Sequence, residues 1–248
     1  MAVALTNKGS GASTTNGGGT VSVTPSANVP LLMAVGVSAA AATHTDDSIA
    51  IAGCNLTWTL LGRVAVWGSR RGTYLFKGVG ASPSTGSPTI TFTPAGASTY
   101  ESHKWSLDEV TGADGTTPFG TVYTYTSGSA TSAPVTVSET PDAGDMVFYA
   151  AGQETNEACS LGGELDTTLA QFGDATGVRR FITAYDSSPD STPVPSVTWA
   201  TTASTGAIAL IVNVAAGGGA TTVVSAPVQV VVPTQLETRS ASVVVIVV

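Results

Sequence analysis

The chain has 248 residues, of which 42% are hydrophobic and only 10% are charged, and its formal net charge is −8. Disordered chains combine low hydrophobicity with high net charge, so we expect most of this chain to fold. Nine basic residues without a basic run exclude nucleic acid as a partner. No apolar stretch has transmembrane length. The first residues show no basic segment followed by an apolar core, so we expect no signal peptide and synthesis in a cytosol.

The chain begins with small polar residues and then turns to strand-like patterns. Residues 1–19 end in a tract of Gly, Ser, Thr and Asn, which predicts a flexible arm. The alternating segment Thr20–Thr24 predicts the first strand. The continuous apolar run Pro30–Val37 predicts a strand that is covered on both faces, and a polar loop follows over residues 39–48.

The rest of the first half carries further strand patterns, several of them alternating between apolar and polar residues. The predicted strands are Leu56–Gly62, Thr73–Lys77, Thr89–Thr93 and Lys104–Val110. The segment Gly112–Gly120 is rich in turn-forming residues, so it is predicted to join this half to the next.

The second half repeats the same kinds of segment. The predicted strands are Pro134–Ser138, Gly144–Ala151 and Ala207–Val214. Residues Thr167–Phe172 are predicted to make at most a short turn, because glycines flank them on both sides. We find no convincing helix anywhere in the chain.

Two stretches of sequence recur at long spacing. The segment Gly68–Lys77 returns as Gly177–Asp186, and Gly86–Thr93 returns as Pro193–Ala200. These echoes predict two pseudo-repeated halves, at about residues 20–112 and 133–215.

Many short strands separated by Gly and Pro indicate an all-β protein with two packed sheets. We expect one β-sandwich domain of the jelly-roll type over residues 20–215, in which each half supplies strands to both sheets around a shared core. Two separate small barrels are the alternative. They are less favoured because each half contains a long loop and few aromatic residues.

The C-terminal region has a different composition. Residues 216–219 are predicted to be a Gly linker, and residues 220–248 to form a Val-rich strand pair that serves in assembly. The segments Ser225–Val232 and Ser240–Val247 repeat each other, and such a short tail cannot build a core of its own. We therefore expect it to pair with the main domain, a copy of itself or a neighbouring subunit. The assembly residues are Val228, Val230, Val232, Val243, Val245 and Val247.

The sequence offers no recognisable catalytic or metal-binding pattern, and we expect no catalytic residue, cofactor or metal. Cys54 and Cys159 are expected to be buried free thiols rather than a disulfide, and no zinc motif includes them. His44 is expected in a solvated loop and His103 at a strand edge. Neither histidine has a partner at ligand spacing.

Four pairs of acidic residues lie close together in the sequence. They are Asp46/Asp47, Asp108/Glu109, Asp142/Asp145 and Glu154/Glu157. Adjacent strand residues point to opposite faces, so Asp108 and Glu109 are not expected to act as a glycosidase pair. The loops at Asp46/Asp47 and Glu154/Glu157 are weaker candidates for calcium, because no EF-hand pattern supports them.

Arginine and tryptophan residues supply the candidate contact sites. Arg70, Arg71, Arg179 and Arg180 recur at the same place in each half. They would contact a partner or an acidic glycan, or, as we prefer, pair with local acids at strand edges. Trp67 and Trp105 are candidate glycan contacts. Trp58 and Trp199 are expected in the core.

Several of these motifs together resemble a known family. The segments Leu56–Gly62, Arg71–Lys77, Thr89–Thr93 and Trp105–Asp114, followed by Thr117-Pro118, resemble a β-sandwich of tailed-bacteriophage virion proteins. The likeness covers roughly residues 20–215 and is strongest to minor tail proteins of phages that infect actinobacteria. It implies a structural role in the virion and no catalytic residues.

The leading expectation is therefore a virion structural protein, most readily a minor tail or fibre-like component held by its C-terminal strands. Its partners would be other virion proteins and copies of itself. A capsid decoration protein is the nearest alternative, and a host-glycan-binding adhesion module is the second. An enzyme acting on envelope polysaccharide is the least favoured class.

Overall fold

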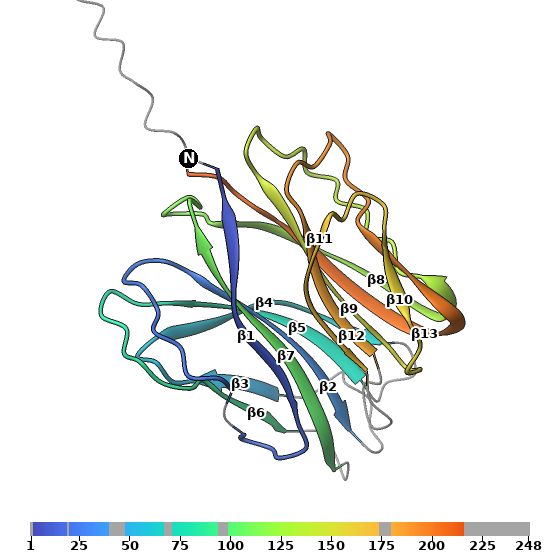
Figure 1. Cartoon of the computed structure of the whole chain (residues 1–248), viewed down its shortest axis with the longest axis horizontal. Helices are drawn as coiled ribbons and strands as arrows, with labels where there is room; N and C mark the ends of the chain where they lie inside the picture. Colours follow the sequence, from blue (N-terminus) through green and yellow to red (C-terminus); the bar gives the residue numbers. More distant parts are fainter. Residues whose placement is uncertain are drawn as a thin grey trace, which may run out of the picture. The chain divides into compact units, whose positions relative to one another are not determined.

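A computed structural model of the chain describes residues 2–18, 20–39, 48–66, 71–93, 99–173 and 180–215. Every helix or strand within these ranges is a β-strand, so the chain is all-β, as predicted (Figure 1). None of the described residues belongs to a helix that could cross a membrane. Through Ala215 they belong to one compact unit, which does not divide into two barrels.

The first half of the chain builds a five-stranded antiparallel sheet, here called the first sheet. Its strands stand in the order β1–β7–β2–β5–β4. They are β1 (Ala4–Ser13), β7 (Tyr100–Thr111), β2 (Leu31–Ala39), β5 (Arg71–Val79) and β4 (Thr57–Val66). Two short strands, β3 (Ser48–Ala52) and β6 (Thr89–Thr93), pair separately beside it.

The second half builds the second sheet, also antiparallel. The order is β10–β13–β9–β12–β11, and β8 pairs with β13 as well. These strands are β8 (Phe119–Ser132), β9 (Met146–Gln153), β10 (Cys159–Gly162), β11 (Thr167–Gly173), β12 (Arg180–Asp186) and β13 (Ser196–Val212).

The strands of the two halves follow the same order across their sheets. In the first sheet an edge strand is followed by β7, β2, β5 and β4, and in the second sheet an edge strand is followed by β13, β9, β12 and β11. Each half thus forms its own sheet. This differs from the expectation that each half supplies strands to both sheets, and from the interleaved chain path of a jelly roll.

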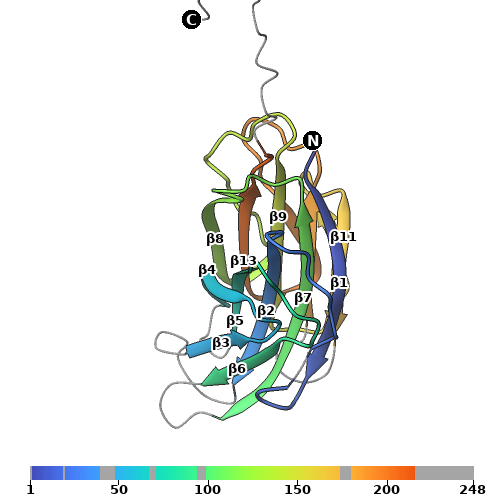
Figure 2. The same cartoon turned by 90° about the vertical axis from the view of Figure 1, so that its left-hand side faces the viewer.

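The side chains of the two sheets alternate between three hydrophobic clusters. Leu32 and Ala34 of β2 face the second sheet and meet Phe148 and Phe181 in a shared inner cluster. Their neighbours on β2, such as Met33, face away into an outer cluster with strands β3 and β6. A third cluster covers the far side of the second sheet. Figure 2 shows β3 and β6 lying against the first sheet.

The continuous apolar runs behave as the sequence predicts. All nine residues of β2 and all eight of β9 are buried. One face of each strand meets the inner cluster and the other an outer cluster, so both faces are mainly apolar; buried Ser38 and Gln153 lie near the strand ends.

The predicted flexible arm at residues 1–19 is wrong for most of its length. Ala4–Ser13 form β1, which pairs with β7 along its whole length. Gly9 and Gly11 account for the composition that suggested a linker. A Cβ on Gly11 would lie 2.9 Å from Cζ2 of Trp105, so glycine is needed there for the indole to pack on β1.

The predicted strands Thr20–Thr24 and Pro134–Ser138 are not regular strands. Val23 forms a single bridge with Gly86, and Val135 donates a backbone hydrogen bond to Pro195. The partner segments carry prolines, which accept hydrogen bonds but have no N–H to donate. A continuous ladder therefore cannot form.

Residues Thr167–Phe172, predicted to make at most a short turn, lie in β11. A register shift between Thr168 and Ala170 marks a bulge that breaks the simple alternation of the strand. Strands β1, β3, β8, β10 and β12 were also missing from the predicted strands.

Candidate functional site

The recurrent arginines converge on one segment of the second half. Arg71 is the first residue of β5 and Arg180 the first of β12, and these strands hold matching places in the two sheets. Arg71 Nη1 lies 2.7 Å from Oε1 of Glu154. Arg180 Nε donates a hydrogen bond of 2.6 Å to the carbonyl of Glu157. Both arginines thus fasten the segment that follows β9. Arg70 and Arg179 lie outside the described residues.

The segment that receives the arginines is itself tied to β13. Buried Gln153 donates to the carbonyl of Thr201 at 3.1 Å, and Thr155 donates to Oε1 of Gln153. The backbone N–H of Glu154 donates to the carbonyl of Ser204. Arg71 thus pairs with an acid of the same chain, as preferred, whereas Arg180 bonds a backbone carbonyl instead of an acid.

The same contacts bear on the calcium expectation. Glu154 is engaged by Arg71, whose positive charge opposes binding of a cation at that carboxylate. Across the ranges that the structure describes, no group of three or more His, Cys, Asp or Glu side chains is arranged to hold a metal ion. Asp46 and Asp47 lie outside those ranges.

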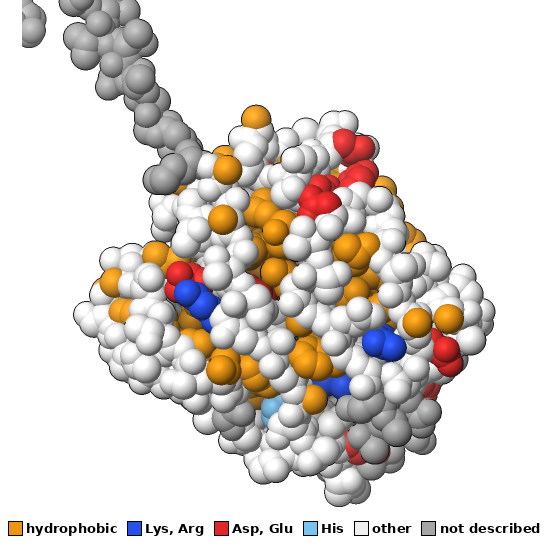
Figure 3. Space-filling view, in the orientation of Figure 1, with side chains coloured by type: hydrophobic (Ala, Val, Ile, Leu, Met, Phe, Trp, Pro, Cys, Tyr) orange, Lys and Arg blue, Asp and Glu red, His pale blue; other side chains and the backbone are white. Residues whose placement is uncertain are grey.

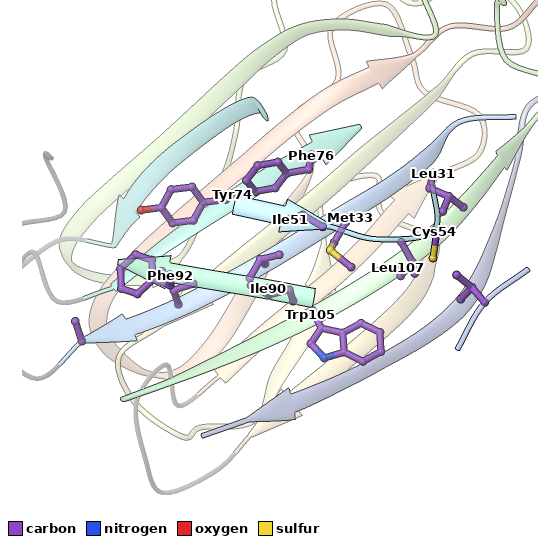
Figure 4. Close-up of a cluster of buried hydrophobic side chains, with 14 residues drawn as sticks. Leu31, Met33, Ile51, Cys54, Tyr74, Phe76, Ile90, Phe92, Trp105 and Leu107 are labelled. Atoms are coloured by element: carbon purple, nitrogen blue, oxygen red, sulfur yellow. The ribbon is translucent and has the colours of Figure 1, made fainter. Parts of the chain in front are cut away.

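Trp105 is not available to stack on a sugar, which corrects its prediction as a glycan contact. The side chain is 4% exposed and belongs to the outer cluster of the first sheet (Figure 4). Glycines of β1 make room for the indole. Trp199 is buried and Trp58 packs against the outer cluster of the first sheet, as expected. Trp67 lies outside the described residues.

His103 is buried, although the sequence predicted a strand edge. The reason is β1, which covers the side of β7 that the flexible-arm prediction left open. Tyr100 Oη donates to the carbonyl of Ser13 at 2.8 Å and lies 2.7 Å from His103 Nδ1. The phenol has one proton, so Nδ1 must donate to the phenol oxygen, and the neutral ring carries its lone pair on Nε2.

The environment keeps this histidine neutral. Burial lowers the pKa of His103 to about 4, and burial raises the pKa of Tyr100 to about 12. Among the described residues, neither Nε2 nor the buried hydroxyl of the adjacent Ser102 has a hydrogen-bond partner. The two groups are therefore not bonded to each other, and the arrangement is not a Ser-His nucleophile.

Ser102 lines an open cavity of about 340 Å³ at the end of β1, together with Ala12, Ser13 and Thr14. These residues bring hydroxyl groups and no charge to the cavity. The cavity has no acid, base or cation among these lining residues with which to activate a substrate.

Asp108 and Glu109 take different partners, as expected for neighbours on a strand. Asp108 accepts hydrogen bonds of 2.8 Å from both Asn7 and Ser106, whereas Glu109 lies 3.3 Å from Lys8. Burial raises the pKa of Asp108 to about 6, against the opposing effect of the two hydrogen bonds. Asp145 bonds the backbone N–H groups of Asp142 and Val214, so its role is structural.

An acidic cluster at the end of β12 and in the neighbouring loops was missed from the sequence. Burial and the nearby Asp190 raise the pKa of Glu164, and burial raises the pKa of Asp186. One carboxylate oxygen of each of these two residues is buried and finds no hydrogen-bond partner in the part of the chain that the structure describes. Glu164 and Asp190 lie in separate loops and Asp186 is the last residue of β12, so the sequence gave no signal of their proximity.

The remaining site predictions concern the ends of the chain and the cysteines. The six assembly valines between Val228 and Val247, and His44, lie outside the described residues. Cys54 is buried and Cys159 half-buried, and both are free thiols.

No protein family, no curated protein and no solved structure matches this chain.

Proposed function

We propose that this protein is a structural component of a bacteriophage virion, a minor tail or fibre-like protein anchored to neighbouring subunits through its C-terminal strands. The observation that carries the proposal is the repeated sheet. Two sheets with the same order of strand neighbours bury one inner cluster between them. Such a molecule is a rigid scaffold, which suits a permanent place in an assembly.

The repeat itself is part of the proposal. We infer that the halves at about 20–112 and 133–215 are copies of one β motif, joined into a β-sandwich. Arg71 and Arg180, which the sequence echo pairs, each begin the strand next to the central apolar strand. The echo of Phe92 in Trp199 is also met by two buried aromatic side chains in the outer clusters.

The glycan-binding alternative loses support. Trp105 is buried, and Arg71 and Arg180 already bond to other groups of the chain. The capsid decoration alternative shares the scaffold argument with the tail proposal, so only location separates the two. The proposal assigns no catalytic activity.

The test is to locate the chain in purified phage particles. Antibody labelling and particle reconstruction are expected to place it on the tail. Labelling of the shell would favour the decoration protein, and absence from purified particles by mass spectrometry would contradict both. A matched virion that carries the chain without residues 220–248 is expected to lose the protein, because its anchor is gone.

A further inference from the structure

The two long sides of the paired sheets differ. On one side β4 and β8 approach closely: a Cβ on Gly62 would lie 2.6 Å from Val122, and Thr126 donates a hydrogen bond of 3.0 Å to the carbonyl of Ala65. These contacts close that side. An additional strand would find no room between the two edges there.

On the opposite side β1 and β11 also come near each other, but each of these edge strands keeps one unpaired edge in the described part of the chain. Among the described residues β1 pairs only with β7, and β11 pairs only with β12. Leu5 of β1 and Leu169 and Phe172 of β11 are half-buried and pack against the inner cluster. Figure 3 shows hydrophobic side chains gathered on this face, over the region that β1 and β11 occupy in Figure 1.

The two open edges are protected unequally. β1 carries Lys8 at a register shift, and both features discourage pairing with a further strand. β11 carries no charged residue and no proline in Thr167–Gly173. β11 contains one bulge, but natural proteins seldom leave an uncharged, proline-free strand edge exposed.

The chain contains a segment suited to this edge. Ser240–Val247 has eight residues, close to the seven of β11, and it has neither charge nor proline. Its Val and Ile side chains favour strands and would extend the apolar surface at Leu169 and Phe172. The related segment Ser225–Val232 is less suitable, because Pro227 lacks the N–H that a ladder needs.

We propose that β11 is an acceptor edge for Ser240–Val247 of a second copy of this chain, which adds as a further strand of the second sheet. The inference rests on the proposed function, since it names the surface through which neighbouring subunits would be joined. Backbone hydrogen bonds would supply affinity, and the apolar side chains at this edge would fix the added strand.

The experiment uses the full chain with the photo-crosslinker p-benzoylphenylalanine in place of exposed Thr168 of β11. This variant is mixed with an isotope-labelled copy of the unsubstituted chain and irradiated. Mass spectrometry is expected to find adducts between Thr168 and residues 240–247 of the labelled copy. Thr121→p-benzoylphenylalanine on β8 is the matched control and should give none. Adducts only within one chain, or only to residues 225–232, would overturn the proposal.

A second measurement separates this inference from the proposed function. Val245→Lys is expected to weaken self-association in sedimentation by about tenfold or more, whereas Val230→Lys changes it little. Association that resists Val245→Lys and gives no β11 adduct would overturn the acceptor edge and leave the structural function standing. A chain that neither associates nor joins particles would overturn the proposed function itself.

Discussion

The two halves cover their outer faces in different ways. In the first half the cover is a separate pair of strands, β3 and β6, which carries fully buried Phe92. In the second half one strand of seventeen residues, β13, both covers the outer face and contributes to the main sheet. Its first residues pair with β10 and bury Trp199, and its later residues lie in the main sheet.

This difference shows which part of the repeat the fold requires. A large aromatic side chain occupies the outer cluster in both halves, but the strand boundaries around it differ. The outer faces are buried within each half, whereas the inner face is buried only when the two sheets meet. Separation of the halves would expose the inner cluster, so we expect them to unfold together.

The largest expected effect comes from Phe181→Ala in the inner cluster. Phe181 is fully buried and lies against Gly36 of the first half, so its loss opens a cavity between the sheets. We expect the free energy of unfolding to fall by about 3–5 kcal/mol. Urea unfolding followed by tryptophan fluorescence and by circular dichroism should still show one coincident transition.

The control for this prediction is Val194→Ala, because Val194 is 37% exposed and should tolerate the change. Two separated transitions, with the first half surviving in Phe181→Ala, would mean that the halves are independent. The inference that the inner cluster makes the two halves unfold together would then be wrong.

A pH effect is expected from Asp108 in β7, an interior strand of the first sheet. Burial raises the pKa of Asp108 from 3.8 to about 6, so the folded chain binds this proton more tightly than the unfolded chain. Its contribution to stability is therefore full below about pH 4 and lost as the pH rises through 6, a change of about 3 kcal/mol. Asp108→Asn should remove this loss.

The measurement is the difference in unfolding free energy between the native chain and Asp108→Asn from pH 4 to 7. The difference is expected to shift in favour of the variant as the pH rises. Asp114→Asn is the control with the opposite sign: hydrogen bonds from Thr117 and Thr116 lower the pKa of this exposed carboxyl. A flat difference for Asp108→Asn would show that burial does not raise the pKa of this carboxyl in the folded chain.

Strong apolar runs and strict alternation were sufficient to predict several strands. Thr89–Thr93 matches β6 at both ends, and Pro30–Val37 falls almost entirely in β2. The sequence failed where glycine served packing rather than flexibility. Nothing local distinguishes Gly11 beneath an indole from a glycine in a linker, because the indole comes from Trp105, far along the chain.

The candidate site was less predictable than the fold. The arginine echo identified Arg71 and Arg180, but their partners Glu154 and Glu157 follow from how β9 ends beside them. Trp105 was predicted to be a surface contact because the segment that forms β1 was predicted to be a flexible arm. Burial of His103 has the same origin, so one misjudged segment accounts for both errors.

A smaller effect is expected at the point where the two halves touch. A Cβ on Gly36 would lie 2.8 Å from Cδ2 of Phe181, so Gly36→Ala must displace the ring or the sheet. We expect a loss of about 1–3 kcal/mol in unfolding free energy. Gly115→Ala is the matched control, because no described residue lies within 4 Å of the added Cβ there. Equal stability of the two variants would mean that the sheets can shift freely.

The smallest effect is expected from the ion pair that joins the halves. Arg71 belongs to the first half and Glu154 to the second, and the Glu154 side chain is 45% exposed. Solvent screening limits such a pair to about 1 kcal/mol or less, and added salt should weaken it. A double-mutant cycle with Arg71→Gln and Glu154→Gln measures the coupling. Arg180→Gln provides the comparison, because Arg180 bonds a carbonyl within its own half. A coupling free energy well above 1 kcal/mol that does not change with salt concentration would show that the ion pair, and not only the inner cluster, holds the two sheets together.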